Sequence, residues 1–283
     1  MKMQEATYYL LNKLRSIYSE SETSQITDWM LEHITGSKKA ERMIYKNETI
    51  TPEEEKQVVQ YTARLLQHEP VQYVLNEAWF CGLKFYVDKN VLIPRPETEE
   101  LVEWIITNLK FPIDELKILD IGTGCGCIPV SLKRRIRKAE VWACDISDLA
   151  LTIARKNADD NGALVDFVGL DFLDEQQRKQ LPQVDIIVSN PPYVPQKDKE
   201  TMQQNVLNYE PHTALFVPDN DPLVFYKAIV EFGKEHLHKG GTIYCEIHED
   251  LGGQVSLLFA SHGYSIELKK DMQQKDRMIK ATR

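Results

Sequence analysis

Four consecutive residues at the end of an apolar run have the chemistry to hold a planar NH2 group. Asn190, Pro191, Pro192 and Tyr193 follow residues 184–188, a run that predicts a buried strand. Asparagine offers one carbonyl acceptor and one NH2 donor, whereas the prolines stiffen the backbone and leave carbonyl oxygens as acceptors. The Tyr193 ring is a flat apolar surface on which a planar group can stack. The tetrad therefore predicts methylation of an amide or amino nitrogen. The alternative is a proline-rich exit from a strand.

A second motif lies upstream, in the order strand, glycine turn, helix. The turn alternates glycine with other residues, as Gly122, Thr123, Gly124, Cys125 and Gly126. Glycines let the backbone approach a ligand, and the amides of the following helix face its polar groups. A dinucleotide-binding turn would need its third glycine where this chain has Cys127. The spacing is instead the one associated with S-adenosylmethionine, and we expect these five residues to contact that cofactor. Taken alone, the turn also fits a nucleotide site or a tight turn.

Two acidic residues follow the next two predicted strands. Residues 140–145 end on Asp145, which we expect to accept hydrogen bonds from both ribose hydroxyls of the cofactor. The strand after it is followed by Asp171 and Phe172. There we expect the carboxylate to accept from the adenine amino group and the phenyl ring to stack on adenine. The alternatives are local, because Asp145 stands just before Ser147 and a predicted helix, and Asp171 could start a short turn.

Composition limits the classes of function that this chain can have. Its 283 residues leave room for two domains, and 42% hydrophobic with 27% charged residues describe a globular protein. No stretch is long enough to span a membrane, and the N-terminus lacks the apolar core of a signal peptide. A net charge of −9 argues against nucleic-acid binding, which needs a basic face. Five irregularly spaced cysteines fit a reducing cytoplasm and predict no metal site. We expect a cytoplasmic monomer.

The order of the predicted elements divides the chain into three parts. Residues 1–70 show helical spacing of apolar residues and predict a small bundle. One of its helices begins with Thr51, Pro52 and Glu54, which predict a capping box with proline at the first helical position. Two short β-rich runs within residues 71–95 predict a β-hairpin linker between domains.

From residue 96 to residue 283, predicted strands alternate with helices. The strands are expected at 117–121, 140–145, 164–170, 184–189 and 241–247, with two closing antiparallel strands at 264–268 and 278–281. This alternation predicts an α/β fold with an open, mostly parallel sheet and helices on both faces. The glycine turn, both acids and Asn190 all follow the carboxyl end of a strand, which is where such sheets bind ligands.

Four segments of the chain together resemble one family. They are residues 69–73, 92–99, 120–128 and 189–193. In sequence and order they are similar to the HemK-like protein-glutamine N5-methyltransferases, and the likeness extends over nearly the whole chain. The resemblance implies a Rossmann-like class I S-adenosylmethionine-dependent methyltransferase domain with a seven-stranded sheet. It also implies an N-terminal helical domain that docks the protein substrate.

The same resemblance assigns roles to the motif residues. Residues 122–126, Asp145, Phe172 and Asn190 would contact S-adenosylmethionine, which leaves as S-adenosylhomocysteine. The tetrad 190–193 would hold the glutamine of a Gly-Gly-Gln loop in a bacterial class-1 peptide chain release factor. The chain departs from the family pattern where glycine is usual, at Asn76, Leu170 and His248.

Alignment is the main catalytic task for such a reaction, because an amide nitrogen is a poor nucleophile and a sulfonium methyl is already a strong electrophile. Asn190, Pro191 and Tyr193 are the predicted catalytic residues. We expect the Asn190 side chain and the Pro191 carbonyl to accept hydrogen bonds from the glutamine NH2. These acceptors also stabilise positive charge that develops on nitrogen in the transition state. The tetrad contains no general base.

Two other substrates remain open at this stage. One is a glutamine in a ribosomal protein, and the other is adenine N6 or cytosine N4 in a nucleic acid, held as a flipped base. The latter needs a basic groove, which the sequence does not show. Arg95 and Glu97 have two interpretations. They could lie beside the cofactor or the interdomain joint, or they could form a salt-bridged turn between prolines. The role of Glu246 is also open.

Overall fold

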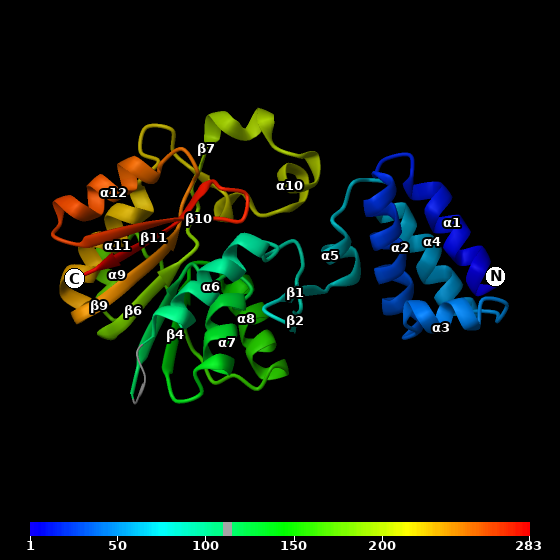
Figure 1. Cartoon of the computed structure of the whole chain (residues 1–283), viewed down its shortest axis with the longest axis horizontal. Coiled ribbons are helices and arrows are strands. Elements are labelled where there is room, and N and C mark those ends of the chain that lie inside the picture. Colours follow the sequence, from blue (N-terminus) through cyan, green and yellow to red (C-terminus); the bar gives the residue numbers. More distant parts are fainter. Residues whose placement is uncertain (110–114) are drawn as a thin grey trace. The chain divides into compact units, whose positions relative to one another are not determined.

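The structure, a computed structural model, describes residues 1–109 and 115–283. Contacts divide the chain into two compact units (Figure 1). One consists of Met1–Glu77 and Gln203–Tyr209, and the other of Ala78–Met202 and Glu210–Arg283. Each unit has its own hydrophobic core. The roles predicted for residues 1–70, 71–95 and 96–283 as docking domain, linker and catalytic domain stay predictions.

The first unit is helical. Its elements are α1 (Met3–Leu14), α2 (Glu20–Thr35), α3 (Lys39–Ile44), α4 (Pro52–Leu65), α5 (Val71–Leu75) and α10 (Gln204–Tyr209). Apolar residues at helical spacing, such as Leu10, Leu14 and Met30, are fully buried between α1, α2 and α4. Although α10 is distant in sequence, the Tyr209 hydroxyl donates to the carbonyl of Gln67 at 2.7 Å.

The predicted capping box at the start of α4 is confirmed. The Thr51 hydroxyl oxygen accepts from the backbone N–H of Glu54 at 3.2 Å, and the Glu54 carboxylate accepts from the backbone N–H of Thr51 at 2.6 Å. Pro52 occupies the first helical position, where its missing N–H costs nothing.

The second unit is built on a seven-stranded, mostly parallel sheet, as predicted. Its strands lie in the order β10-β11-β9-β6-β3-β4-β5. They are β3 (Lys117–Ile121), β4 (Glu140–Asp145), β5 (Asp166–Gly169), β6 (Val184–Ser189), β9 (Leu237–Glu246), β10 (Ser265–Lys270) and β11 (Asp276–Thr282). Strands β9, β6, β3, β4 and β5 are parallel, whereas β11 pairs antiparallel with both β9 and β10. The two closing strands are therefore confirmed as an antiparallel pair.

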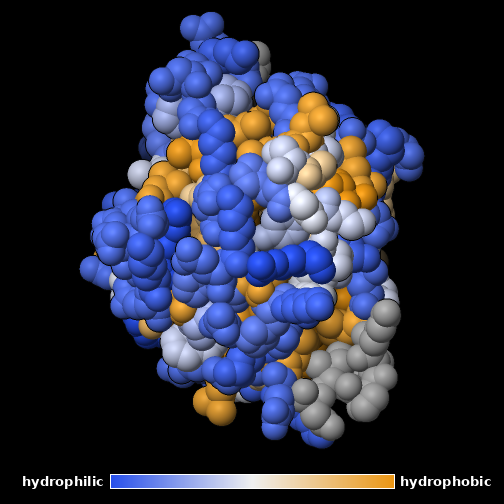
Figure 2. Space-filling model, turned by 90° about the vertical axis from the view of Figure 1, so that its left-hand side faces the viewer, coloured by the Kyte–Doolittle hydropathy of each residue, from blue (hydrophilic) through white to orange (hydrophobic). Residues whose placement is uncertain are grey.

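Helices cover both faces of this sheet. Helices α6 (Pro96–Asn108), α7 (Cys127–Arg135) and α8 (Asp148–Asp160) form one group, while α11 (Val224–His236) and α12 (Gly252–Ser261) pack against β9, β10 and β11. Consecutive residues of β3 and β6 are buried, which is the pattern of strands covered on two sides. The face that Figure 2 shows is largely hydrophilic, with hydrophobic residues mostly between the polar ones.

Shorter elements complete the second unit. Strands β1 (Ala78–Phe80) and β2 (Leu83–Phe85) form the predicted hairpin. Its two-residue loop has positive φ at Cys81 and Gly82, which suits the twist of a tight hairpin. After the tetrad come β7 (Val194–Pro195), the 3-10 helices η1 (Gln196–Thr201) and η2 (His212–Ala214), and β8 (Phe216–Val217); the small helix α9 (Glu175–Arg178) follows β5. No helix in the part of the chain described has the length and apolarity needed to cross a membrane.

Replacement of Thr51 by alanine should lower the free energy of unfolding by about 1 kcal/mol, because α4 loses the side-chain oxygen that caps it. Urea denaturation followed by circular dichroism measures the change. Thr51→Ser keeps the hydroxyl and should remain within a few tenths of a kcal/mol of the parent. Equal losses in the serine and alanine variants would show that the cap does not stabilise this helix.

Candidate active site

The candidate site lies where the strand order reverses. β3 stands between β4 and β6, and the residues Cys144 and Ser189 both align with Ile121 at the last position of β3. The residues that follow, Gly122, Asp145 and Asn190, therefore emerge at the same edge of the sheet. Such a switch point leaves a crevice between the connections that run to opposite faces.

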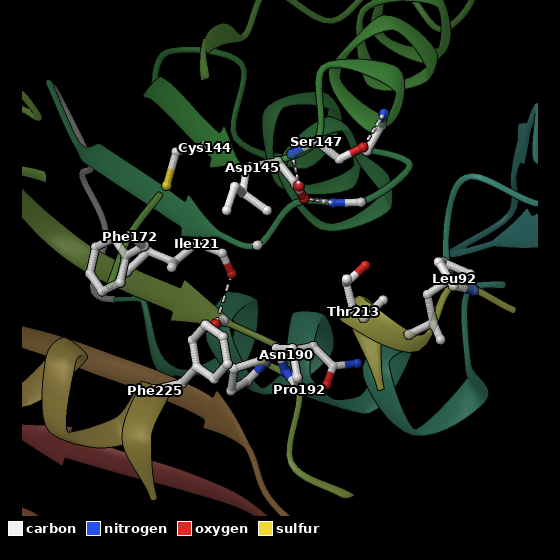
Figure 3. A pocket seen from close by; sticks show the side chains of 18 of the residues that line it. Leu92, Ile121, Cys144, Asp145, Ser147, Phe172, Asn190, Pro192, Thr213 and Phe225 are labelled. Carbon is white, nitrogen blue, oxygen red and sulfur yellow. Dashed lines mark hydrogen bonds between the residues drawn. The ribbon is translucent and has the colours of Figure 1, made fainter. Parts of the chain in front are cut away.

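A cavity of about 540 Å³ occupies this edge (Figure 3). Asp145 and Asn190 flank it from different strand ends, with Phe172 on one side and Leu92 and Thr213 on the other. Among the predicted site residues, those that line it are Gly122, Gly124, Asp145, Asp171, Phe172, Asn190, Pro191 and Pro192. Residues Thr123, Cys125, Gly126 and Tyr193 do not line it, so their predicted ligand contacts stay predictions.

The backbone conformation of the glycine turn explains why three of its positions are glycine. Gly122, Gly124 and Gly126 have φ of 73°, 54° and 81°, a region that residues with a Cβ rarely adopt. At Gly122 and Gly124 an added Cβ would meet no protein atom within 4 Å, so open space lies beside the backbone there. At Gly126 it would approach the Cβ of Ala154 to 3.1 Å. The first two glycines thus leave room for a ligand, while Gly126 lets α7 and α8 pack closely.

Asp145 is held in place by backbone amides. Its two carboxylate oxygens accept from the N–H of Gly124 at 2.8 Å and of Ser147 at 2.9 Å. Burial raises the pKa of its carboxyl, and these amide hydrogen bonds oppose the rise. Helix α8 is capped by Ser147, whose hydroxyl oxygen accepts from the N–H of Ala150. A carboxylate has about four acceptor positions, so this one can still accept a hydrogen bond from a ligand in the cavity.

Asp171 and Phe172 form the edge of the cavity after β5. One Asp171 oxygen accepts from the backbone N–H of Leu173 at 2.9 Å, so this residue starts a short turn. Phe172 is 5% exposed and meets Phe232 edge to face, with ring centroids 5.3 Å apart. The adenine contacts predicted for this pair stay predictions.

A chain of hydrogen bonds that the sequence did not reveal holds Asn190. The side-chain NH2 of Asn190 donates to the Thr98 hydroxyl at 3.0 Å, and that hydroxyl donates to the Glu246 carboxylate at 2.6 Å. The Tyr193 hydroxyl donates to the other Glu246 oxygen at 2.9 Å. Burial raises the pKa of Glu246, and burial together with the carboxylate raises the pKa of Tyr193 well above its usual value. The Tyr193 ring meets His248 edge to face.

Asp120 is a second residue that the sequence reasoning did not single out. It is fully buried in β3, and neither of its carboxylate oxygens makes a hydrogen bond to the residues that the structure describes. Burial raises the pKa of this carboxyl to about 7, and the nearby Asp145 carboxylate adds to the rise. Its position two residues before the first glycine of the turn was the available sequence signal.

Arg95 takes part in an ion pair on the other side of the tetrad. Its guanidinium donates to the Glu210 carboxylate at 2.5 Å, and the second Glu210 oxygen accepts from the backbone N–H of Ile93. Glu210 is 4% exposed. Arg95 also lines a smaller cavity together with Asn190, Pro191 and Tyr193. The structure therefore shows a salt-bridged segment that borders the tetrad.

Comparisons with known proteins identify the family of this chain. Residues 98–213 match the family model described as methyltransferase small domain, and residues 5–75 match the PrmC N-terminal domain. A relative from Bacteroides thetaiotaomicron, named release factor glutamine methyltransferase, is 39% identical over 282 residues, which cover 99% of this chain and 100% of the relative. The chain belongs to the release factor glutamine methyltransferase family.

Other members and a more distant structure support the family and the fold. A release factor glutamine methyltransferase from Flavobacterium psychrophilum is 49% identical over 79% of this chain and 80% of its own length. A solved methyltransferase from Pyrococcus furiosus, 18% identical, aligns with a TM-score of 0.52 over 79% of this chain and 98% of that one, which shows a shared fold alone. The class I methyltransferase fold predicted from the sequence is therefore confirmed, and the chain is a methyltransferase. Among the described residues, no group of three or more His, Cys, Asp or Glu could hold a metal ion.

The buried Asp120 carboxyl should make stability depend on pH. The folded chain holds this proton up to about pH 7, whereas an unfolded aspartate releases it near pH 4. The unfolded state then binds fewer protons between these values, so the free energy of unfolding falls as pH rises through them. Asp120→Asn removes this titration. The free energy of unfolding of Asp120→Asn, taken relative to that of the wild type, should therefore rise by on the order of 1–3 kcal/mol from pH 5 to pH 8.

Urea denaturation at the two pH values measures this gain. Asp148→Asn, at an exposed aspartate in the first turn of α8, is the control and should show no such gain. A stability difference between Asp120→Asn and the wild type that is the same at pH 5 and pH 8 would contradict the raised pKa.

Proposed function

We propose that this enzyme transfers a methyl group from S-adenosylmethionine to the side-chain amide nitrogen of the glutamine in the Gly-Gly-Gln segment of a bacterial class-1 release factor. One observation carries the proposal. The Asn190 NH2 is bonded to Thr98, and no described residue donates to the Asn190 carbonyl oxygen, so that oxygen is free to accept from a substrate NH2. The relative from Bacteroides thetaiotaomicron, which matches over nearly the whole length of the chain, bears the matching name.

The residues around the cavity fit S-adenosylmethionine. Gly122 and Gly124 leave open space beside the backbone, and the Asp145 carboxylate, which lines the cavity, keeps acceptor capacity beyond its backbone hydrogen bonds. Buried Phe172 supplies an apolar aromatic surface in the same cavity. When bound, the cofactor supplies an electrophilic methyl group. The chain's own residues would hold its ribose at Asp145 and its adenine near Asp171 and Phe172.

The tetrad orients the substrate nitrogen. The Asn190 carbonyl oxygen and the Pro191 carbonyl each take one hydrogen of the glutamine NH2, which fixes the plane of the amide. The two acceptors face the nitrogen as it becomes positively charged, so they stabilise the transition state more than the ground state. The nitrogen loses its proton after the transfer, and the reaction therefore needs no base from the tetrad. The reaction mainly requires alignment of the nitrogen with the methyl group, and the two fixed carbonyl acceptors provide it.

The remaining expectations extend this proposal beyond the active site. The helical unit would dock parts of the release factor outside its glutamine loop, and the enzyme would act as a cytoplasmic monomer. Nucleic acid is a less suitable substrate, since the chain carries a net charge of −9. The relatives' names likewise do not favour a ribosomal-protein substrate.

Incubation of the purified enzyme with labelled S-adenosylmethionine and a class-1 release factor should label one glutamine, which peptide mass mapping identifies. Asn190→Ala should lower kcat by roughly 10²–10³-fold, because the transition state loses a hydrogen-bond acceptor and the amide its orientation. Cofactor affinity, measured by calorimetry, should change much less. Unchanged turnover in Asn190→Ala, or methylation at a residue other than glutamine, would contradict the proposed function.

Asp145→Ala should weaken cofactor binding, whereas Asn190→Ala should mainly lower kcat. The loss of the carboxylate removes two charge-assisted acceptor positions for the ribose, so the Kd for S-adenosylhomocysteine should rise on the order of 10–100-fold. Asp148→Ala, three residues further along the chain and exposed at the first turn of α8, is the matched control and should keep the parent's Kd. Equal affinities of the two variants for S-adenosylhomocysteine would rule out the ribose contact.

A further inference from the structure

A buried carboxylate lies behind the tetrad without touching the larger cavity. Glu246, the last residue of β9, is 1% exposed and does not line that cavity. Its two oxygens accept from hydroxyls on two other elements: Thr98 in the first turn of α6 and Tyr193 after β6. Thr98 is itself 2% exposed. Both side chains are thus shielded from water, which would otherwise offer them alternative hydrogen-bond partners.

The order of donors and acceptors along this chain fixes its direction. An ionised carboxylate only accepts hydrogen bonds, and a hydroxyl has one proton to donate. Since Thr98 gives its proton to Glu246 at 2.6 Å, its oxygen can only accept from Asn190. The group of Asn190 that lies at 3.0 Å from Thr98 must therefore be its NH2, and the carbonyl oxygen must be the other end of the amide. Without this constraint, the two ends of an asparagine amide have nearly the same shape.

We propose that Thr98 and Glu246 are positioning residues that set the orientation of the Asn190 amide and so make the site select a glutamine NH2 over a glutamate carboxylate. This inference rests on the proposed function. A carbonyl oxygen facing the substrate attracts an NH2 donor and repels a carboxylate, whereas a reversed Asn190 would present NH2 and do the opposite. The two substrate groups have almost the same size, so hydrogen-bond polarity is the property that can distinguish them.

The first turn of α6 places Thr98 for this task. Pro96 begins the helix and Thr98 is its third residue, with Arg95 just before it. The segment before the helix is tied down by the ion pair of Arg95 with Glu210. The motif at residues 92–99 thus contributes a threonine hydroxyl to the tetrad, as well as an ion pair beside it.

The experiment compares Thr98→Val with Thr98→Ser. Valine has nearly the shape of threonine but lacks the hydroxyl, whereas serine keeps it. Thr107→Val, on the same helix, removes a hydroxyl that bonds only to helix carbonyls and is the matched control. Two quantities are measured for each enzyme. The first is kcat with a purified class-1 release factor. The second is a ratio of two constants: the Ki of a release factor in which the methylated glutamine is replaced by glutamate, divided by the KM of the unchanged release factor.

Thr98→Val should lower kcat roughly tenfold or more, since a neutral hydrogen bond that orients the amide is lost. Its ratio of Ki to KM should fall at least about threefold, because a reversed Asn190 presents an NH2 that donates to the glutamate carboxylate. Thr98→Ser and Thr107→Val should keep both quantities near the wild-type values. If Thr98→Val does not fold, Thr98→Ala is used in its place, with the same expectations.

Two outcomes are distinguishable. If the wild type methylates the release factor and the variant without the hydroxyl keeps the wild-type ratio, the positioning role is wrong, whether or not kcat falls. A general loss of order in the site would lower kcat and weaken the binding of both release factors equally, so the ratio of Ki to KM would not change. Failure of the wild type itself to methylate the release factor would overturn the proposed function, and the inference with it.

Discussion

The Glu246 carboxylate is the point at which three elements of the second unit meet. It ends β9 and accepts hydrogen bonds from the first turn of α6 and from the segment after β6. A buried carboxylate left without partners would be costly, whereas one that accepts two hydroxyls in a fixed geometry is tolerated. The contact therefore couples the positions of β9, α6 and the tetrad. Disturbance of any one of them leaves a polar group unpaired inside the protein.

The order of the strands explains why this contact lies beside a cofactor cavity. β3 is central, so the connection after it turns toward β4 and Asp145, while Asn190 follows β6 on its other side. One side of the crevice consequently presents a carboxylate to a sugar and the other presents an amide to a substrate nitrogen. The reacting groups are brought together by topology, since the distance between neighbouring parallel strand ends is fixed by the sheet.

Much of this arrangement follows from local sequence. Apolar runs predicted the strands, and the alternating glycines predicted a turn that lets the backbone approach a ligand. The positive φ of Gly122 and Gly124 and the open space beside them fit that prediction. The capping box at Thr51 is likewise local, because it needs only residues three positions apart.

The contacts that orient the site are not local, and no sequence pattern indicated them directly. Thr98 and Glu246 are 148 residues apart, and Arg95 and Glu210 are 115 residues apart, so no periodicity connects them. The motif at residues 92–99 marked Thr98 by resemblance only, and Glu246 was a strand-end acid of unassigned role. Which residues of the glycine turn line the cavity also depends on how α7 packs against α8, as Gly126 shows.

The most direct test is a crystal structure of the enzyme with S-adenosylhomocysteine and a class-1 release factor bound together. The account predicts that the glutamine nitrogen lies about 2.7–3.2 Å from both the Asn190 carbonyl oxygen and the Pro191 carbonyl, with its face toward the cofactor sulfur. A glutamine whose carbonyl, rather than its NH2, meets Asn190, or one that enters the cavity away from residues 190–193, would contradict it.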